Sequence, residues 1–289
     1  WIRTRTGIRE RRISSGEGTR HLAAKAAERA LAAAGVAPEE LDIIILGTSS
    51  PDRNYPSDAC SVQAAIGAVN AVAFDISAAC AGFIFAMNIV EGFFKAGIYK
   101  TALIIGAETL SKVTDWNDRG TCVLFGDGAG AAVLKAEETG IIDMMMGADG
   151  TKGDVLACTS RTVGNFLTGT KPELGFMTMD GQEVFKFAVR KVPESVMELL
   201  QRTGTKKEDI KYYVLHQANE RIIEAAARRL KEPMEKFPMT IGQFGNTSTA
   251  SIPLLLDDMI QKDMLKRGDK IIMSGFGAGM TWGAVLMEW

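Results

Sequence analysis

The chain has 289 residues, of which 46 % are apolar, and a formal net charge of −2. This length can bury a large core as two domains or two fused halves. The charge excludes nucleic acid as the main ligand, because no basic field would displace phosphate counterions. Four cysteines show no metal-ligand spacing, so we expect reduced thiols in a cytoplasmic protein without a metal. The longest apolar stretch, Ile76–Val90, is too short for a membrane span.

The first half of the chain alternates helical patterns with apolar runs that are typical of strands buried on both faces. Helices are predicted at 22–34, 58–66 and 79–95, and strands at 41–47, 71–76 and 101–106. Two runs that flank a glycine-rich turn, 121–125 and 129–134, predict a pair of antiparallel strands. Strands that alternate with helices indicate an α/β fold with helices on both faces of the sheet.

The second half repeats this order. A strand at 210–215 corresponds to the strand at 41–46. A helix at 249–264, a strand at 271–275 and a strand at 282–286 correspond to 79–95, 101–106 and 128–134. The repeat is much longer than a solenoid unit and predicts two duplicated α/β halves, 1–140 and 141–289. A functional cleft is expected where the two halves meet.

Cys80 stands at the start of the helix predicted at 79–95, after a strand-like run. At a helix N-terminus, the dipole and the free N–H groups favour the thiolate, the nucleophilic form of cysteine. The alternative is a small buried hydrophobe in an alanine-rich segment.

His216 and Asn246 are polar residues at the edges of predicted elements. His216 follows the strand 210–215, and strand ends are where sites gather in open α/β folds. Asn246 lies in Gly245-Asn246-Thr247-Ser248. A lone histidine is more often structural, and the asparagine could serve only in a turn or a helix cap. With Cys80 they supply a nucleophile and two hydrogen-bonding groups, which indicates thioester or acyl chemistry.

Two glycine-rich runs differ in meaning. The run 126–131 fits the dinucleotide pattern, but it continues as a strand and offers no helix N-terminus to a pyrophosphate. The run 275–279 follows a strand and could supply backbone N–H groups to an oxyanion, or be a plain turn. A basic run at the start of the chain could be a solvated face or hold a nucleotide; it comprises Arg3, Arg5, Arg9, Arg11 and Arg12.

Several runs together resemble the β-ketoacyl-acyl-carrier-protein synthase III family, which has the thiolase fold. The matching runs are 1–8, 125–134, 216–219, 245–248 and 281–283. The resemblance covers essentially the whole chain and implies layered αβαβα halves. It also implies that a segment with the first strand, which family members carry before the position of Trp1, is missing here. The implied reaction joins an acyl-CoA, typically acetyl-CoA, to malonyl-acyl carrier protein with loss of carbon dioxide, which initiates fatty-acid synthesis.

The resemblance also implies a role for each site residue. Cys80 would take the acyl group, and the N–H groups of Cys80 and Ala278 would hold its oxyanion. His216 and Asn246 would donate hydrogen bonds to the malonyl thioester carbonyl, and Phe276 would pack beside the malonyl carboxylate.

Further residues would bind the substrates and the partner. The acyl-CoA is a substrate, and no cofactor is implied. Trp1 and Arg119 would hold the CoA adenine, and Arg5 and Asn219 would line its phosphate and pantetheine path. Arg221 would meet the carrier protein. Tyr55 would close the acyl pocket across a homodimer interface. Ala278 and Tyr55 stand where many members have glycine and phenylalanine, which leaves the preferred primer open.

Two other functions share features with this sequence. A starter synthase of a polyketide or alkyl-quinolone pathway would use the same fold with another primer. A papain-like cysteine hydrolase has Cys, His and Asn in this order, but its cysteine context is missing here.

Overall fold

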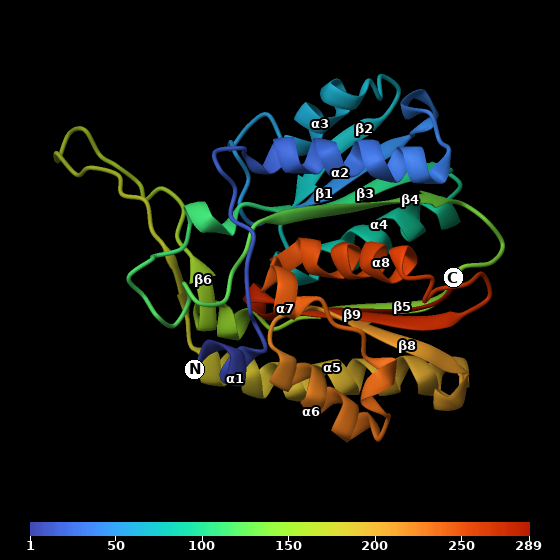
Figure 1. Ribbon diagram of the computed structural model, residues 1–289. Helices are drawn as coiled ribbons and strands as arrows, with labels where there is room; N and C mark the ends of the chain where they lie inside the picture. Colours follow the sequence, from blue (N-terminus) through green and yellow to red (C-terminus); the bar gives the residue numbers. More distant parts are fainter.

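The computed structural model describes all 289 residues, and its elements form five layers (Figure 1). Two sheets alternate with three layers of helices. From one side of the molecule to the other, the helical layers are α2 (Thr19–Ala34) with α3 (Asp58–Ile66), α4 (Gly82–Lys95) with α8 (Ser251–Gln261), and α5 (Gly181–Thr203) with α6 (Glu220–Leu230). This is the layered α/β architecture that the resemblance implied.

The first sheet has the order β2-β1-β3-β4. Its strands are β2 (Val72–Ile76), β1 (Ile43–Gly47), β3 (Thr101–Glu108) and β4 (Gly128–Lys135). The first three are parallel, and β4 is antiparallel to β3. Ile43 and Ile45 of β1 pack on the α4 and α8 side, whereas Ile44 and Leu46 belong to the cluster beside α2 and α3. Both faces of β1 are buried, which explains its unbroken apolar sequence.

The second sheet has the order β5-β10-β9-β8. Its strands are β5 (Ile141–Ala148), β10 (Thr281–Glu288), β9 (Lys270–Gly277) and β8 (Ile210–Leu215). Strand β8 is parallel to β9, and β10 is antiparallel to both β9 and β5. The run β8-β9-β10 therefore repeats the arrangement of β1-β3-β4. The predicted division between residues 140 and 141 falls at the start of β5.

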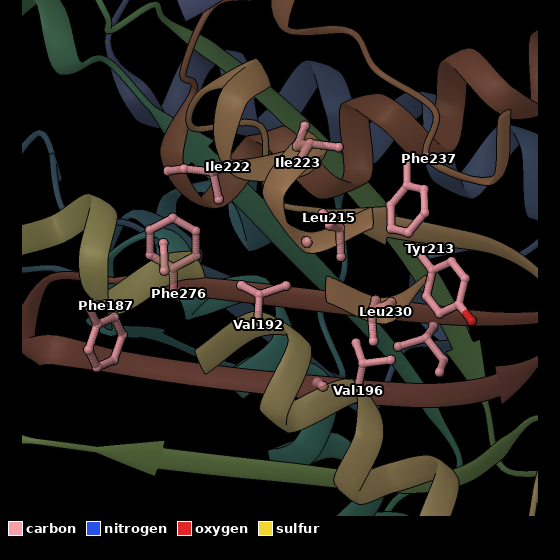
Figure 2. Packing of buried hydrophobic residues seen from close by; sticks show 14 of the residues in the cluster. Phe187, Val192, Val196, Tyr213, Leu215, Ile222, Ile223, Leu230, Phe237 and Phe276 are labelled. Atoms are coloured by element: carbon pink, nitrogen blue, oxygen red, sulfur yellow. The ribbon is translucent and has the colours of Figure 1, made fainter. Parts of the chain in front are cut away.

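Three apolar clusters fill the spaces between the layers. The cluster between the second sheet and helices α5 and α6 is the largest, with 25 buried residues. Figure 2 shows part of it, with Tyr213 and Phe237 at one end and Phe276 toward the other. The rings of Tyr213 and Phe237 stack with centroids 4.8 Å apart. The cluster thus supports the strand end that carries Phe276.

The structure corrects one expectation and adds one long helix. The run 121–125 forms turns, and β4 pairs with β3, so the predicted antiparallel pair 121–125/129–134 is wrong. The segment after it is held otherwise, because Phe125 makes an isolated bridge to Asn246 and the carboxylate of Asp127 accepts the Ser14 and Ser111 N–H groups. Helix α5 was not predicted. Asp180 caps it by accepting the Gln182 and Glu183 N–H groups.

Shorter elements complete the fold: α1 (Ile2–Thr6), α7 (Ile241–Phe244), β6 (Leu156–Cys158) and β7 (Met177–Met179). Between β6 and β7 the chain projects as a long arm (Figure 1). A cavity of about 1230 Å³ lies along β4, between α2, α4 and α8. No side chain of Cys80, His216 or Asn246 lines it, so it is not the candidate site. None of the helices is long and apolar enough to cross a membrane.

Candidate active site

Cys80 lies in a single 3₁₀ turn, Ala79–Ala81, between β2 and α4. Cys80 is only 7 % exposed, and this burial raises the pKa of its thiol to about 12. The Ser248 side chain beside it acts in the opposite direction, and the Glu108 carboxylate adds to the rise. The expected thiolate is therefore wrong for the free protein. Helix α4 begins only at Gly82, two residues beyond Cys80, and burial is the largest influence on the pKa of the thiol.

Residues of the second half hold the Cys80 turn. The Thr249 hydroxyl lies 2.8 Å from the Ala79 carbonyl and 2.9 Å from the Glu108 carboxylate, so these two acceptors share its single hydrogen. The Thr281 hydroxyl lies 2.9 Å from the Ala78 carbonyl. The end of β9 lies against the same turn, since a Cβ added to Gly277 would meet the Cys80 nitrogen at 2.5 Å. Only glycine permits this close approach.

His216 directly follows β8 and is 2 % exposed. Its backbone N–H donates to the Ser274 carbonyl of β9 at 2.8 Å. The imidazole and the Phe276 ring pack in a T-shaped pair, with centroids 5.3 Å apart. Burial lowers the pKa of His216 to about 3, so the ring is neutral at physiological pH. A neutral imidazole has one N–H donor and one acceptor nitrogen.

Asn246 lies between α7 and α8 and is 6 % exposed. Its backbone N–H donates to Leu124, and its carbonyl accepts the Gly126 N–H, both at 2.9 Å. The side-chain oxygen Oδ1 accepts the Ser248 N–H at 2.8 Å. Because an N–H can donate only to an acceptor, this contact identifies the oxygen end of the amide and leaves the NH₂ group without a protein acceptor.

The carboxylate of Glu108, at the end of β3, is a buried hub that the sequence analysis missed. It accepts hydrogen bonds from hydroxyl and N–H groups of both halves. The donors are Thr48, Ser49 and Ser50 after β1, and Ser248 and Thr249 before α8. An acidic residue at the end of one buried strand, beside a Thr-Ser-Ser run at the end of another, was the signal that could have revealed it.

These contacts bring the three predicted residues to one buried place between the halves. Ser248 lies beside the Cys80 sulfur and is hydrogen-bonded to Asn246. The end of β9 contacts the Cys80 turn through Gly277 and the His216 ring through Phe276. Ala278 begins the 3₁₀ turn that follows β9. A thiol, a neutral imidazole and an amide thus lie near one another at the junction of the two halves.

Four of the residues expected to bind CoA or the carrier protein gather around α1. Asn219 caps α6 by accepting the Arg221 N–H at 2.9 Å, and its amide donates to the Arg5 carbonyl at 3.2 Å. The Arg221 guanidinium donates to the Thr4 carbonyl at 3.0 Å. At the start of α1, Trp1 is 68 % exposed.

Arg119 and Tyr55, two further predicted residues, come from the first half. The Arg119 guanidinium lies over the Trp1 ring, 5.6 Å from its centroid, so the two residues contact each other directly. Tyr55 precedes α3 and is 85 % exposed. Nothing in this chain covers it. No group of three or more His, Cys, Asp or Glu side chains is placed to hold a metal ion.

Two family models match most of this chain. The model of 3-oxoacyl-[acyl-carrier-protein] synthase III matches residues 74–150, and the model of its C-terminal part matches residues 200–289. The β-ketoacyl-[acyl-carrier-protein] synthase III of Clostridium acetobutylicum is 52 % identical over all of this chain and 90 % of its own length.

Solved structures agree. The crystal structure of 3-oxoacyl-[acyl-carrier-protein] synthase III from Aquifex aeolicus is 46 % identical, with a TM-score of 0.93 over all of this chain and 90 % of that one. A priming β-ketosynthase from a polyketide biosynthetic pathway is less similar, at 35 % identity and a TM-score of 0.90, over 100 % of this chain and 87 % of that one. Neither the polyketide nor the cysteine-hydrolase alternative is favoured. The chain belongs to the β-ketoacyl-acyl-carrier-protein synthase III family.

Proposed function

We propose that this protein condenses an acyl-CoA primer, acetyl-CoA foremost, with malonyl-acyl carrier protein. The product is a 3-oxoacyl carrier protein, and the reaction initiates fatty-acid synthesis. The observation that carries the proposal is the buried junction at which Ser248 and the end of β9 link the Cys80 turn to Asn246 and His216. Family membership supports the same reaction.

In the first step, the Cys80 sulfur attacks the thioester carbon of the acyl-CoA. The bond from that carbon to the CoA sulfur breaks, and the thiol proton leaves with CoA. This transfer fits a cysteine that holds its proton in the free protein, because no net proton is needed. The N–H groups of Cys80 and Ala278 stabilise the oxyanion. Close contact of Gly277 with the Cys80 nitrogen supports this pairing of the two segments.

In the second step, malonyl-acyl carrier protein loses carbon dioxide. The electron pair of the broken carbon–carbon bond passes to the thioester carbonyl and forms an enolate, which His216 and Asn246 stabilise by hydrogen bonds. The free NH₂ end of Asn246 and the neutral His216 ring suit this role. Phe276 makes the pocket apolar beside the carboxylate, which favours its loss. The enolate carbon then attacks the acyl group and releases the Cys80 sulfur, which takes a proton from solvent.

The residues around α1 are proposed to bind the CoA and the carrier protein. Trp1 and Arg119 would separate to admit the adenine, with Arg5 and Asn219 along the rest of the CoA path. Arg221 is an exposed cation on α6 that would meet an acidic carrier surface.

We further propose a homodimer in the cytoplasm. Tyr55 is highly exposed, and β2 is an edge strand with no neighbour on its outer side. A second copy that covers this edge would give Tyr55 a partner pocket. All four cysteines are free thiols, which fits a reducing compartment.

The test is to incubate the protein with acetyl-CoA and with longer acyl-CoAs, and to weigh the Cys80-containing peptide. Acetylation of Cys80, followed by 3-oxoacyl product when malonyl carrier protein is added, supports the proposal. Cys80→Ser should lose both, and Cys158→Ser, a change at an exposed cysteine, should lose neither. Labelling only by long or aromatic primers would overturn the role in initiation.

A further inference from the structure

The His216 ring is held by a serine that none of the assigned roles includes. Ser251, the first residue of α8, is 2 % exposed, and its Oγ lies 2.6 Å from Nδ1 of His216. The other ring nitrogen, Nε2, makes no hydrogen bond to the protein. It is nevertheless not a fully buried atom without a partner, so part of its surface is exposed. Nε2 therefore borders the open space of the site.

Gln217 determines what the serine can do. Its backbone N–H donates to Ser251 Oγ at 3.3 Å. Its side chain is fixed at both ends, because the amide nitrogen donates to the Leu215 carbonyl at 2.7 Å and the oxygen accepts the Thr240 and Ile241 N–H groups. The backbone after His216 is thereby held with this N–H directed at the hydroxyl oxygen.

The hydroxyl of Ser251 has one hydrogen to donate, and the Gln217 N–H already occupies one of its lone pairs. If Nδ1 also donated to the oxygen, the buried hydroxyl hydrogen would have no acceptor, since its contacts are Gln217 and His216 alone. If Nδ1 accepts that hydrogen, every group is paired. Burial without a partner is costly enough to favour the paired form by roughly tenfold or more.

We propose that Ser251 is a positioning residue that keeps His216 in the tautomer with its proton on Nε2. This inference rests on the proposed function for its consequence. Only this tautomer presents an N–H to the malonyl thioester carbonyl beside the free amide of Asn246. The opposite tautomer would present a lone pair to the enolate oxygen and destabilise it.

The chain makes the tautomer directly measurable, because it contains only two histidines. The protein is labelled with ¹⁵N-histidine. The change His21→Gln, at an exposed residue of α2, removes the other histidine, so that only the signals of His216 remain in the spectrum. We expect the pair of ¹⁵N shifts of a neutral imidazole protonated at Nε2, at neutral pH and without substrate. An Nδ1-protonated ring, or a mixture of the two tautomers, would overturn the inference even if the enzyme condenses its substrates normally.

Variants test the consequence. Ser251→Ala should lower carbon dioxide release from malonyl carrier protein about tenfold and leave acetylation of Cys80 within a few-fold of the parent. Ser251→Thr, which keeps the hydroxyl, should restore most of the release. Ser195→Ala is the matched control, because Ser195 is as buried but donates to the Lys191 carbonyl within α5. Equal loss of release and acetylation in Ser251→Ala would show a general packing role and contradict the inference. If acetyl-CoA does not acetylate Cys80 of the parental protein, that result would instead contradict the proposed function.

Discussion

The ends of corresponding strands have different roles in the two halves. Strands β1 and β8 correspond, as do β3 and β9. In the first half, the end of β1 leads into hydroxyl residues that bond to Glu108 at the end of β3. In the second half, the end of β8 leads into His216, which packs against Phe276 at the end of β9.

The difference shows how a duplicated fold can divide its work. The strand ends of the first half form a buried polar anchor, whereas the end of β8 in the second half presents His216, a hydrogen-bond donor proposed for chemistry. Glu108 connects the two, because it also accepts from Ser248 and Thr249, the residues that position Asn246 and the Cys80 turn. The proposed nucleophile, Cys80, instead follows β2, a strand that has no counterpart in the second sheet.

The largest effect is expected where the second half supplies a donor. In a Cys80→Ala background, which separates decarboxylation from transfer, His216→Ala should lower carbon dioxide release by about 10²–10³-fold, because one preorganised donor to the enolate is lost. Release is measured with malonyl carrier protein. A rate unchanged from that of Cys80→Ala alone would show that the imidazole does not act on this group.

The anchor of the first half is tested by Glu108→Gln, which keeps the size of the side chain but leaves one acceptor oxygen for several donors. The free energy of unfolding should fall by about 2–4 kcal/mol, because buried donors lose a charged acceptor. Condensation should slow about tenfold through misplacement of Asn246 and the Cys80 turn. Glu28→Gln, in an exposed ion pair with Lys25, should change stability by less than about 0.5 kcal/mol. Parental stability in Glu108→Gln would contradict the anchor.

Acid stability distinguishes the two strand ends further. The pKa of His216 is about 3 when folded and near 6.5 when unfolded, so the unfolded chain binds the extra proton as the pH falls below 6.5. This histidine should therefore lower the free energy of unfolding by about 2 kcal/mol between pH 7 and pH 5. In denaturation experiments, the free energy of unfolding of His216→Gln should fall by about 2 kcal/mol less than that of the parent over the same pH range. His21→Gln should behave as the parent does, and a parental pH slope in His216→Gln would mean the ring is not held neutral.

The smallest effect concerns the outer surface of the second half. Arg221→Glu should raise the apparent KM for malonyl carrier protein roughly fivefold by reversing one docking charge. Acetylation of Cys80 by acetyl-CoA should change much less. Arg228→Glu, on the same helix but farther from α1, serves as the control. Equal damage to both reactions would show that Arg221 acts by anchoring α1 through Thr4.

Most of the fold could be predicted because its central strands are buried on both faces, and their apolar runs stand out from the helices between them. The predicted strand 210–215 and helix 58–66 match the structure at both ends. The turns at 121–125 could not be predicted, because their apolar residues pack against segments distant in the sequence and not in a sheet. Strand β5 was also missed, because its methionine-rich run, which contains Asp143, does not alternate cleanly between apolar and polar residues.

The sequence predicted which residues would gather at the candidate site, but not the residues that support them. Cys80, His216 and Asn246 could be identified from their types and from the edges at which they stand. The protonation state of Cys80 could not be predicted from the sequence, because it depends on burial by both halves. The same is true of Glu108 and Ser251, whose partners lie far away in the sequence.

The central claim is that a sulfur from one half and two donors from the other act on the same acyl transfer. It is tested most directly by the discharge of acetyl-Cys80, followed by intact mass after malonyl carrier protein is added, in a His216→Ala/Asn246→Ala double variant. The account predicts that this variant still becomes acetylated within a few-fold of the parental rate but discharges at least about 10²-fold more slowly. Discharge at the parental rate would contradict it.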